Sequence, residues 1–135
     1  MPNWCVGTLR VRGKQKDLQE LNKVFDTLVS NCPALEKVCE TWGDQHMLTI
    51  AMEENAELIQ AISKIKRNGW DPINASHLDE ETADVLICIC ELYLMDYLEV
   101  REIAGIIERK IERSMKRTQD HIKELEEEAR CDGSF

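Results

Sequence analysis

The sequence is poor in aromatic residues, which make up only 5% of the chain, although 43% of the residues are hydrophobic and 32% are charged. A core of Leu, Ile, Val, Ala and Met is typical of a soluble helical protein, and this hydrophobic content excludes an intrinsically disordered chain. The length of 135 residues is that of one domain.

Positive charge is also scarce, because 17 Lys and Arg residues face 26 Asp and Glu residues and leave a net charge of −9. Nucleic-acid affinity comes mainly from basic side chains that displace counterions, so this balance argues against a nucleic-acid partner. No apolar run approaches the roughly 20 residues of a membrane-spanning helix, and the N-terminus lacks the features of a signal peptide. We therefore expect no membrane partner and a cytoplasmic location.

Signatures of zinc and disulfide scaffolds are absent as well. The six cysteines include no CxxC pair and have no His at zinc-ligand spacing. We interpret them as free thiols that serve mostly as small core residues. His46, His77 and His121 have no partner at a useful spacing, so they are interpreted as structural or surface residues.

Apolar residues recur at helical spacing along most of the chain, which predicts an all-α fold. The alternation of residues 4–12 predicts one short N-terminal β-strand, which has no partner strand within the chain. The last helix carries an apolar seam that needs cover from another subunit. The predicted helices cover residues 16–29, 34–42, 45–67, 76–95 and 99–129, with Asn68-Gly69 closing the third, residues 70–75 as a loop and Ser76 capping the fourth.

Two acidic segments, EENAE on one predicted helix and EETAD on the next, carry the candidate chemistry. Glu54 and Glu57 lie on a stripe whose other members are apolar, and Glu81 and Asp84 lie on the corresponding stripe of the next helix. Most acidic runs on helices are solvated faces, which is the alternative interpretation. Inward-facing carboxylates need a cation, and neither stripe carries a Lys or Arg nearby, so we expect Mg²⁺ or Mn²⁺ and phosphate chemistry.

The pattern EExxE, followed across a helix-loop-helix by EExxD, resembles the MazG-like, all-α nucleoside triphosphate pyrophosphohydrolase family. The likeness covers roughly residues 40–118 and includes the longer strings EENAELIQA and EETADVL. It implies a helical bundle, at residues 31–130, that is completed by formation of a homodimer or homotetramer. It also implies a Mg²⁺-dependent enzyme, with Mn²⁺ as a substitute, that cleaves the α–β phosphate bond of a nucleoside triphosphate in the nucleotide pool and yields a monophosphate and pyrophosphate.

The resemblance assigns four carboxylates to the metal and leaves the glutamate that precedes each inner pair as a candidate general base. The implied metal ligands are Glu54, Glu57, Glu81 and Asp84, and the candidate bases are Glu53 and Glu80. The same resemblance leaves two alternatives of function open: a pyrophosphohydrolase of alarmones such as guanosine tetraphosphate, and a helical interaction protein that binds nucleotide or metal without turnover.

The last helix of the family carries a Lys, an Asn and an Arg, and the matching positions here are Lys110, Ser114 and Arg117. The resemblance assigns Lys110 and Arg117 to phosphate charge, whereas Ser114 departs from the pattern at a sugar or phosphate contact. The alternative is that these basic residues only pair with glutamates on their own helix. Trp70, between the acidic helices, is a candidate for stacking on a base or for packing.

The N-terminal segment carries a second resemblance. The opening MPNWC, followed by a predicted strand and helix, is similar over about 25 residues to the start of a small ferredoxin-like domain of phage and plasmid proteins. We therefore expect residues 1–30 to form an extension of the helical domain and residues 131–135 to form a frayed tail. If the protein is phage-encoded, its expected location is the host cytoplasm.

Overall fold

The computed structural model of the chain describes residues 17–133, which are almost entirely helical and include no strand. The all-α fold class is therefore confirmed for this part of the chain, and the strand predicted for residues 4–12 lies outside it. The helices are α2 (Asp17–Ser30), α3 (Cys32–Trp42), α4 (Asp44–Asn68), α5 (Pro72–Leu94) and α6 (Val100–Asp132).

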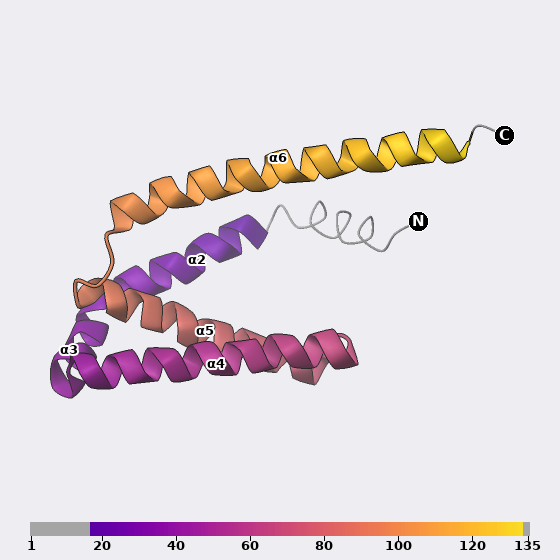
Figure 1. Cartoon of the computed structure of the whole chain (residues 1–135). Coiled ribbons are helices and arrows are strands. Elements are labelled where there is room, and N and C mark those ends of the chain that lie inside the picture. Colours follow the sequence, from indigo (N-terminus) through magenta and orange to yellow (C-terminus); the bar gives the residue numbers. More distant parts are fainter. Residues whose placement is uncertain (1–16, 134–135) are drawn as a thin grey trace. The chain divides into compact units, whose positions relative to one another are not determined.

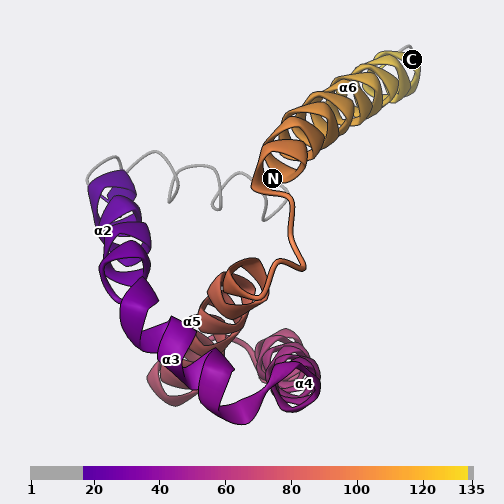
Figure 2. The ribbon, with the colours of Figure 1, turned by 90° about the vertical axis from the view of Figure 1, so that its left-hand side faces the viewer.

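The chain divides into two units, the first ending at Tyr97 and the second beginning at Leu98. In the first unit, α4 and α5 run antiparallel, side by side, as a helical hairpin (Figures 1 and 2). Helix α3 packs against both of them, mostly against α5, and α2 contacts α3. The hairpin therefore brings the two acidic segments onto neighbouring helices.

Two glycines set the ends of α4. Gly43 and Gly69 have φ angles of 78° and 81°, a backbone region that side chains disfavour. The N–H of Gly69 donates to the carbonyl of Ile65 at 2.9 Å, which ends the helix one residue after Asn68. The expected closure of this helix at Asn68-Gly69 is confirmed.

The start of α5 differs from the prediction. The helix begins at Pro72, and its N-cap is Asp71, whose Oδ1 accepts the backbone N–H groups of Ile73 and Asn74 at 2.9 Å. The predicted start at Ser76 is therefore wrong, and the loop predicted over residues 70–75 is confirmed for residues 70–71 but wrong for residues 72–75. Proline is favoured in the first helical turn, where its missing N–H costs nothing, so Asp71-Pro72 is itself a start signal.

The buried apolar core of the described chain is small and comes from α3, α4 and α5. Two of its members are alanines of α4, which allow a close approach of neighbouring helices. Two others are cysteines, as predicted, and both are free thiols. The buried apolar residues are Cys39, Met47, Ala51, Ala61, Val85 and Cys88.

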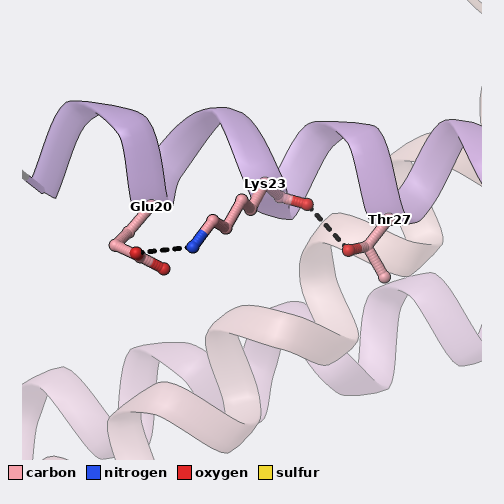
Figure 3. Close-up of polar contacts among 3 residues, drawn as sticks. All are labelled: Glu20, Lys23 and Thr27. Atoms are coloured by element: carbon pink, nitrogen blue, oxygen red, sulfur yellow. Dashed lines mark hydrogen bonds and ion pairs between the residues drawn. The ribbon is translucent and has the colours of Figure 1, made fainter.

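Figure 3 shows two polar contacts between residues of helix α2. The Nζ of Lys23 lies 2.7 Å from the Oε1 of Glu20, and the hydroxyl of Thr27 donates to the carbonyl of Lys23 at 2.7 Å. Its apolar residues Leu21 and Phe25 stay about half exposed. Helix α2 therefore presents an apolar surface that the first unit does not cover.

Helix α6 is a single helix of 33 residues that forms the described part of the second unit. No side chain of residues 100–131 is buried, and the seam residues Ile111, Met115, Ile122 and Leu125 are all exposed. Among the described residues, no helix combines the length and apolar character needed to cross a membrane.

Candidate metal centre

Three of the four predicted metal ligands meet between α4 and α5. Glu54 and Glu57 of α4 and Glu81 of α5 each offer a carboxylate oxygen, and these oxygens all lie within 4.8 Å of one another. Spacing by three residues places the first two on one face of α4, and the antiparallel hairpin brings the third beside them. We call Glu54, Glu57 and Glu81 the acidic triad. Oxygen ligands in such a group suit hard divalent cations.

Glu81 is the buried member of the triad, with 7% of its surface exposed. Its Oε1 lies 3.4 Å from the Nδ1 of His77, one turn earlier on α5, whereas its Oε2 is buried and has no hydrogen-bond partner. A buried carboxylate oxygen without a partner is costly, and a bound cation would satisfy it. The group at this position therefore fits a metal ligand.

Negative charge accumulates around Glu54. Burial raises the pKa of the Glu54 carboxyl, and the charges of Asp84, Glu57, Glu81 and Glu53 raise it further, in that order. Asp84, the fourth predicted ligand, is outside the 4.8 Å group but is the charged neighbour with the largest effect on Glu54. Repulsion of this kind favours a cation or a proton at the cluster.

The degree of burial differs among the acids that the sequence places inward. Glu81 is buried and Glu54 and Asp84 are half-buried, but Glu57 is exposed. The expectation that all four point into a core is therefore wrong for Glu57. Its exposure leaves one side of the triad open to solvent, which a site for a phosphate substrate requires.

The two candidate bases, Glu53 on α4 and Glu80 on α5, are exposed and stand one residue before the inner acids of their helices. Glu53 is rotated by about 100° around the helix axis from Glu54, and Glu80 by the same angle from Glu81. The charge of Glu53 reaches Glu54, because it contributes to the raised pKa of that carboxyl. The choice between the two bases stays a prediction.

A pocket of about 230 Å³ adjoins the acids at Glu54 and Asp84. The rings of Trp42 and His46 stack at its edge, with centroids 4.9 Å apart and planes inclined by 24°. Glu91 lines the same pocket, is only 5% exposed, and has a pKa raised by burial. The other lining residues are Val38, Met47, Ile50, Ile87 and Cys88.

Several of these residues were missed or misjudged from the sequence. The interpretation that the histidines lack partners is wrong, because His46 stacks on Trp42, His77 pairs with Glu81, and His121 lies 3.6 Å from Glu124. Each partner is three or four residues away in the sequence, within one helix for His77 and His121, and across Gly43 from the end of α3 to the start of α4 for His46. The signal was thus present in the sequence, as it was for Glu91, which continues the stripe of Glu81, Asp84 and Cys88 at alternating spacings of three and four.

The remaining candidates lie outside the triad and the pocket. Trp70 is 70% exposed in the short connection between α4 and α5 and does not line the pocket. Lys110, Ser114 and Arg117 are exposed on α6 at spacings of four and three, which places them on one helix face in the second unit. Their assignment to substrate stays a prediction.

Comparisons with known proteins give no match for this chain among protein-family models, curated proteins or solved structures.

Proposed function

We propose that this protein is a Mg²⁺-dependent nucleoside triphosphate pyrophosphohydrolase that cleaves the α–β phosphate bond. The observation that carries the proposal is the acidic triad, in which the buried Oε2 of Glu81 has no partner while two further carboxylates lie close by. The resemblance of the two acidic segments to the MazG-like family supports the reaction type.

The carboxylates of the triad, with Asp84, would hold the metal. When bound, Mg²⁺ supplies charge neutralisation at the phosphates and lowers the pKa of a coordinated water. The Nδ1 of His77 lies 3.4 Å from the Oε1 of Glu81, whereas the Oε2 has no partner and is available to a cation. The half-buried Glu54 needs the cation more than an exposed acid does, because desolvation and the charges of the neighbouring carboxylates both act on it.

The proposed reaction is a hydrolysis. The oxygen of water bonds to one phosphorus atom of the α–β bridge, the bond from that phosphorus to the bridging oxygen breaks, and the water proton passes to Glu53 or Glu80. Nucleoside monophosphate and pyrophosphate leave. Lys110 and Arg117 are proposed to bind phosphate, because Lys and Arg side chains donate charge-assisted hydrogen bonds to phosphate oxygens.

The proposal includes the assembly and location of the protein. We propose a MazG-like bundle that is completed in a homodimer or homotetramer, supported by the apolar side chains that α2 and α6 leave exposed. The proposed location is the cytoplasm, or the host cytoplasm for a phage-encoded protein.

The deciding experiment incubates the purified protein and Mg²⁺ with a panel of standard and modified ribo- and deoxyribonucleoside triphosphates and alarmones. Pyrophosphate release and nucleotide chromatography are followed together. We expect monophosphate and pyrophosphate to form, and we expect the reaction to stop when EDTA removes the Mg²⁺. Release of orthophosphate with a diphosphate, or no turnover of any compound, would contradict the proposal. Turnover of alarmones alone would favour the alarmone enzyme.

A further inference from the structure

The pocket beside Glu54 and Asp84 has the size and shape for one ring rather than a whole ligand. Its volume of about 230 Å³ is below the roughly 300–1,000 Å³ of pockets that enclose complete small-molecule ligands. Trp42 and His46 bring aromatic rings to its lining, and Ile50 and Ile87 add apolar surface. A planar ring whose polar remainder stays outside fits these dimensions.

The charged groups of the pocket are all carboxyls. Glu54, Asp84 and Glu91 line it, and no Lys or Arg does so within the described part of the chain. Glu91 is 5% exposed and lines this pocket, its side chain makes no hydrogen bond or ion pair among the described residues, and its carboxyl oxygens still reach solvent. Because a ring that enters displaces this solvent, it should bring N–H donors that replace the lost hydrogen bonds of the carboxyl.

The pocket and the acidic triad share Glu54, so one ligand can occupy both. A triphosphate held at the triad would have its base close to the mouth of the pocket. We propose that this pocket binds the nucleobase of the substrate and that Glu91 selects bases with an exocyclic amino group by accepting its hydrogen bond. The inference rests on the proposed function for the identity of the ligand as a nucleotide.

The chemistry of the base edge makes the selection specific. A carboxyl oxygen accepts from an amino N–H in either protonation state, whereas an ionised carboxylate has no hydrogen to offer to a keto oxygen. Cytosine and uracil differ in this way at one position, and guanine carries an amino group that hypoxanthine lacks. The amino member of each pair is expected to bind at least about tenfold more tightly, as is usual for a hydrogen bond to a charged group.

The test measures binding apart from turnover. Calorimetry with Mg²⁺ at about pH 8.5, where a carboxyl is ionised, compares the α,β-methylene analogues of CTP and UTP, and then those of GTP and ITP. The wild-type protein should prefer the amino member of each pair at least about tenfold. Glu91→Gln should reduce the CTP preference to about threefold or less, because the amide can donate to the keto oxygen.

Two matched variants complete the design. Glu40→Gln changes an exposed glutamate of α3 that does not line the pocket, so the preference should stay at its wild-type value. Trp42→Ala should weaken both members of a pair and leave their ratio unchanged, since it removes the stacking surface. Thermal unfolding verifies that each variant is folded, and the wild-type ratios decide the question even if Glu91→Gln fails to fold.

The outcomes separate this inference from the proposed function. Equal binding of the two members of each pair by the wild-type protein, or an unchanged preference in folded Glu91→Gln, overturns the role of Glu91 even where triphosphates are hydrolysed. A preference that depends on Glu91, in a protein that turns over no natural triphosphate, supports the base pocket and contradicts the proposed function. Absence of nucleotide binding overturns both.

Discussion

At the scale of single residues, the acidic triad derives its properties from unequal burial. Glu81 is buried, with its Oε1 beside His77 and its Oε2 unpaired, whereas Glu57 faces solvent. One end of the triad is thus buried, and the other is open to solvent. A cation at this position would satisfy Glu81 and remain accessible on the side of Glu57.

The first prediction concerns the acids themselves. Glu54→Gln and Asp84→Asn should each lower kcat by at least about a hundredfold, because each removes a proposed metal ligand. The stability of the metal-free protein should not fall, since either change relieves repulsion between carboxylates. Steady-state assays with urea unfolding of the metal-free variants test both parts.

Asp79→Asn is the matched control, because Asp79 is an exposed acid of α5 outside the triad and the pocket. Its activity should equal that of the wild-type protein. Near-normal turnover in purified Glu54→Gln or Asp84→Asn would remove the substituted residue from the proposed site.

The second prediction concerns the thiol of Cys88. Burial raises its pKa from 9.0 to about 11, with smaller contributions from Glu91, Glu54 and Asp84. At pH 8 the thiolate fraction is therefore about a hundredfold lower than for an ordinary thiol, and the thiolate is the reactive form. Limited treatment with iodoacetamide and peptide mass mapping should find Cys88 unmodified in the folded protein.

The same treatment in urea provides the control, because unfolding removes both the burial and the nearby carboxylates. Cys88 should then react like the other cysteines. Rapid labelling of Cys88 in the folded state would contradict the packing of this residue beside the acids.

The sequence could predict those features of the site that depend on spacing within one helix, but not those that depend on packing between helices. The meeting of Glu54, Glu57 and Glu81 followed from helical spacing and two matched motifs. The exposure of Glu57 did not, because it depends on how far α4 is covered by other helices. The sequence did not single out Glu91 as a pocket residue. It continues the stripe of Glu81, Asp84 and Cys88, but a lone acid in an apolar run belongs to no recognised motif.

At the scale of elements, the helices of the described chain were predictable to within about two residues at most ends, which is the usual uncertainty of helix boundaries. The exceptions were the start of α5, which lies four residues before the predicted one, and the end of α6, which lies three residues after the predicted one. Ser76 with Asp79 resembled a capping box, but Asp71 and Pro72 form the actual start four residues earlier. The segment therefore holds two possible N-caps, Asp71 and Ser76. The structure decides between them, because the side chain of Asp71 accepts the backbone N–H groups of the first turn.

The third prediction tests which residue caps α5. Asp71→Ala should lower the free energy of unfolding by about 1 kcal/mol, because its Oδ1 accepts two backbone N–H groups. Ser76→Ala should change it by less than about 0.5 kcal/mol, since Ser76 is an exposed residue inside the helix. Urea unfolding of both variants gives the comparison, and a larger loss for Ser76→Ala would contradict the observed start.

The fourth prediction concerns α6. Lys110→Ala and Arg117→Ala should each weaken substrate binding or turnover about tenfold by removing a charge-assisted bond to phosphate. The affinity for Mn²⁺ should not change, because these residues are assigned to phosphate and not to the metal. Kinetics and a Mn²⁺ titration on the same preparations test the two parts together.

Lys123→Ala serves as the control for α6, since Lys123 is an exposed lysine outside the proposed phosphate-binding face. It should leave both measurements unchanged. Unchanged kinetics in Lys110→Ala and Arg117→Ala would return these residues to the alternative in which they only pair with glutamates of their own helix.

At the scale of the whole molecule, the buried core is too small for the apolar content of the chain. Large apolar side chains such as Phe25, Ile59 and Ile62 remain about half exposed or more. An apolar groove of about 360 Å³ also lies along α2 and α5, with Val24, Leu28 and Leu86 among its lining residues. Apolar surface of this extent is typical of an interface with another protein chain.

The last prediction is that the protein is at least a homodimer. Light scattering coupled to gel filtration at micromolar concentration should give a mass of two or four chains of 15.6 kDa each. Ile111→Glu combined with Met115→Glu should shift the mass towards one chain, because both residues are exposed on the seam of α6 and would place charges in an apolar contact. Lys116→Glu, one residue beside the seam, should leave the assembly intact, since its side chain is already charged and solvated.

A wild-type mass near 15.6 kDa would contradict the assembly. A multimer that persists in the double variant would instead place the interface on the apolar surfaces of α2, α4 and α5.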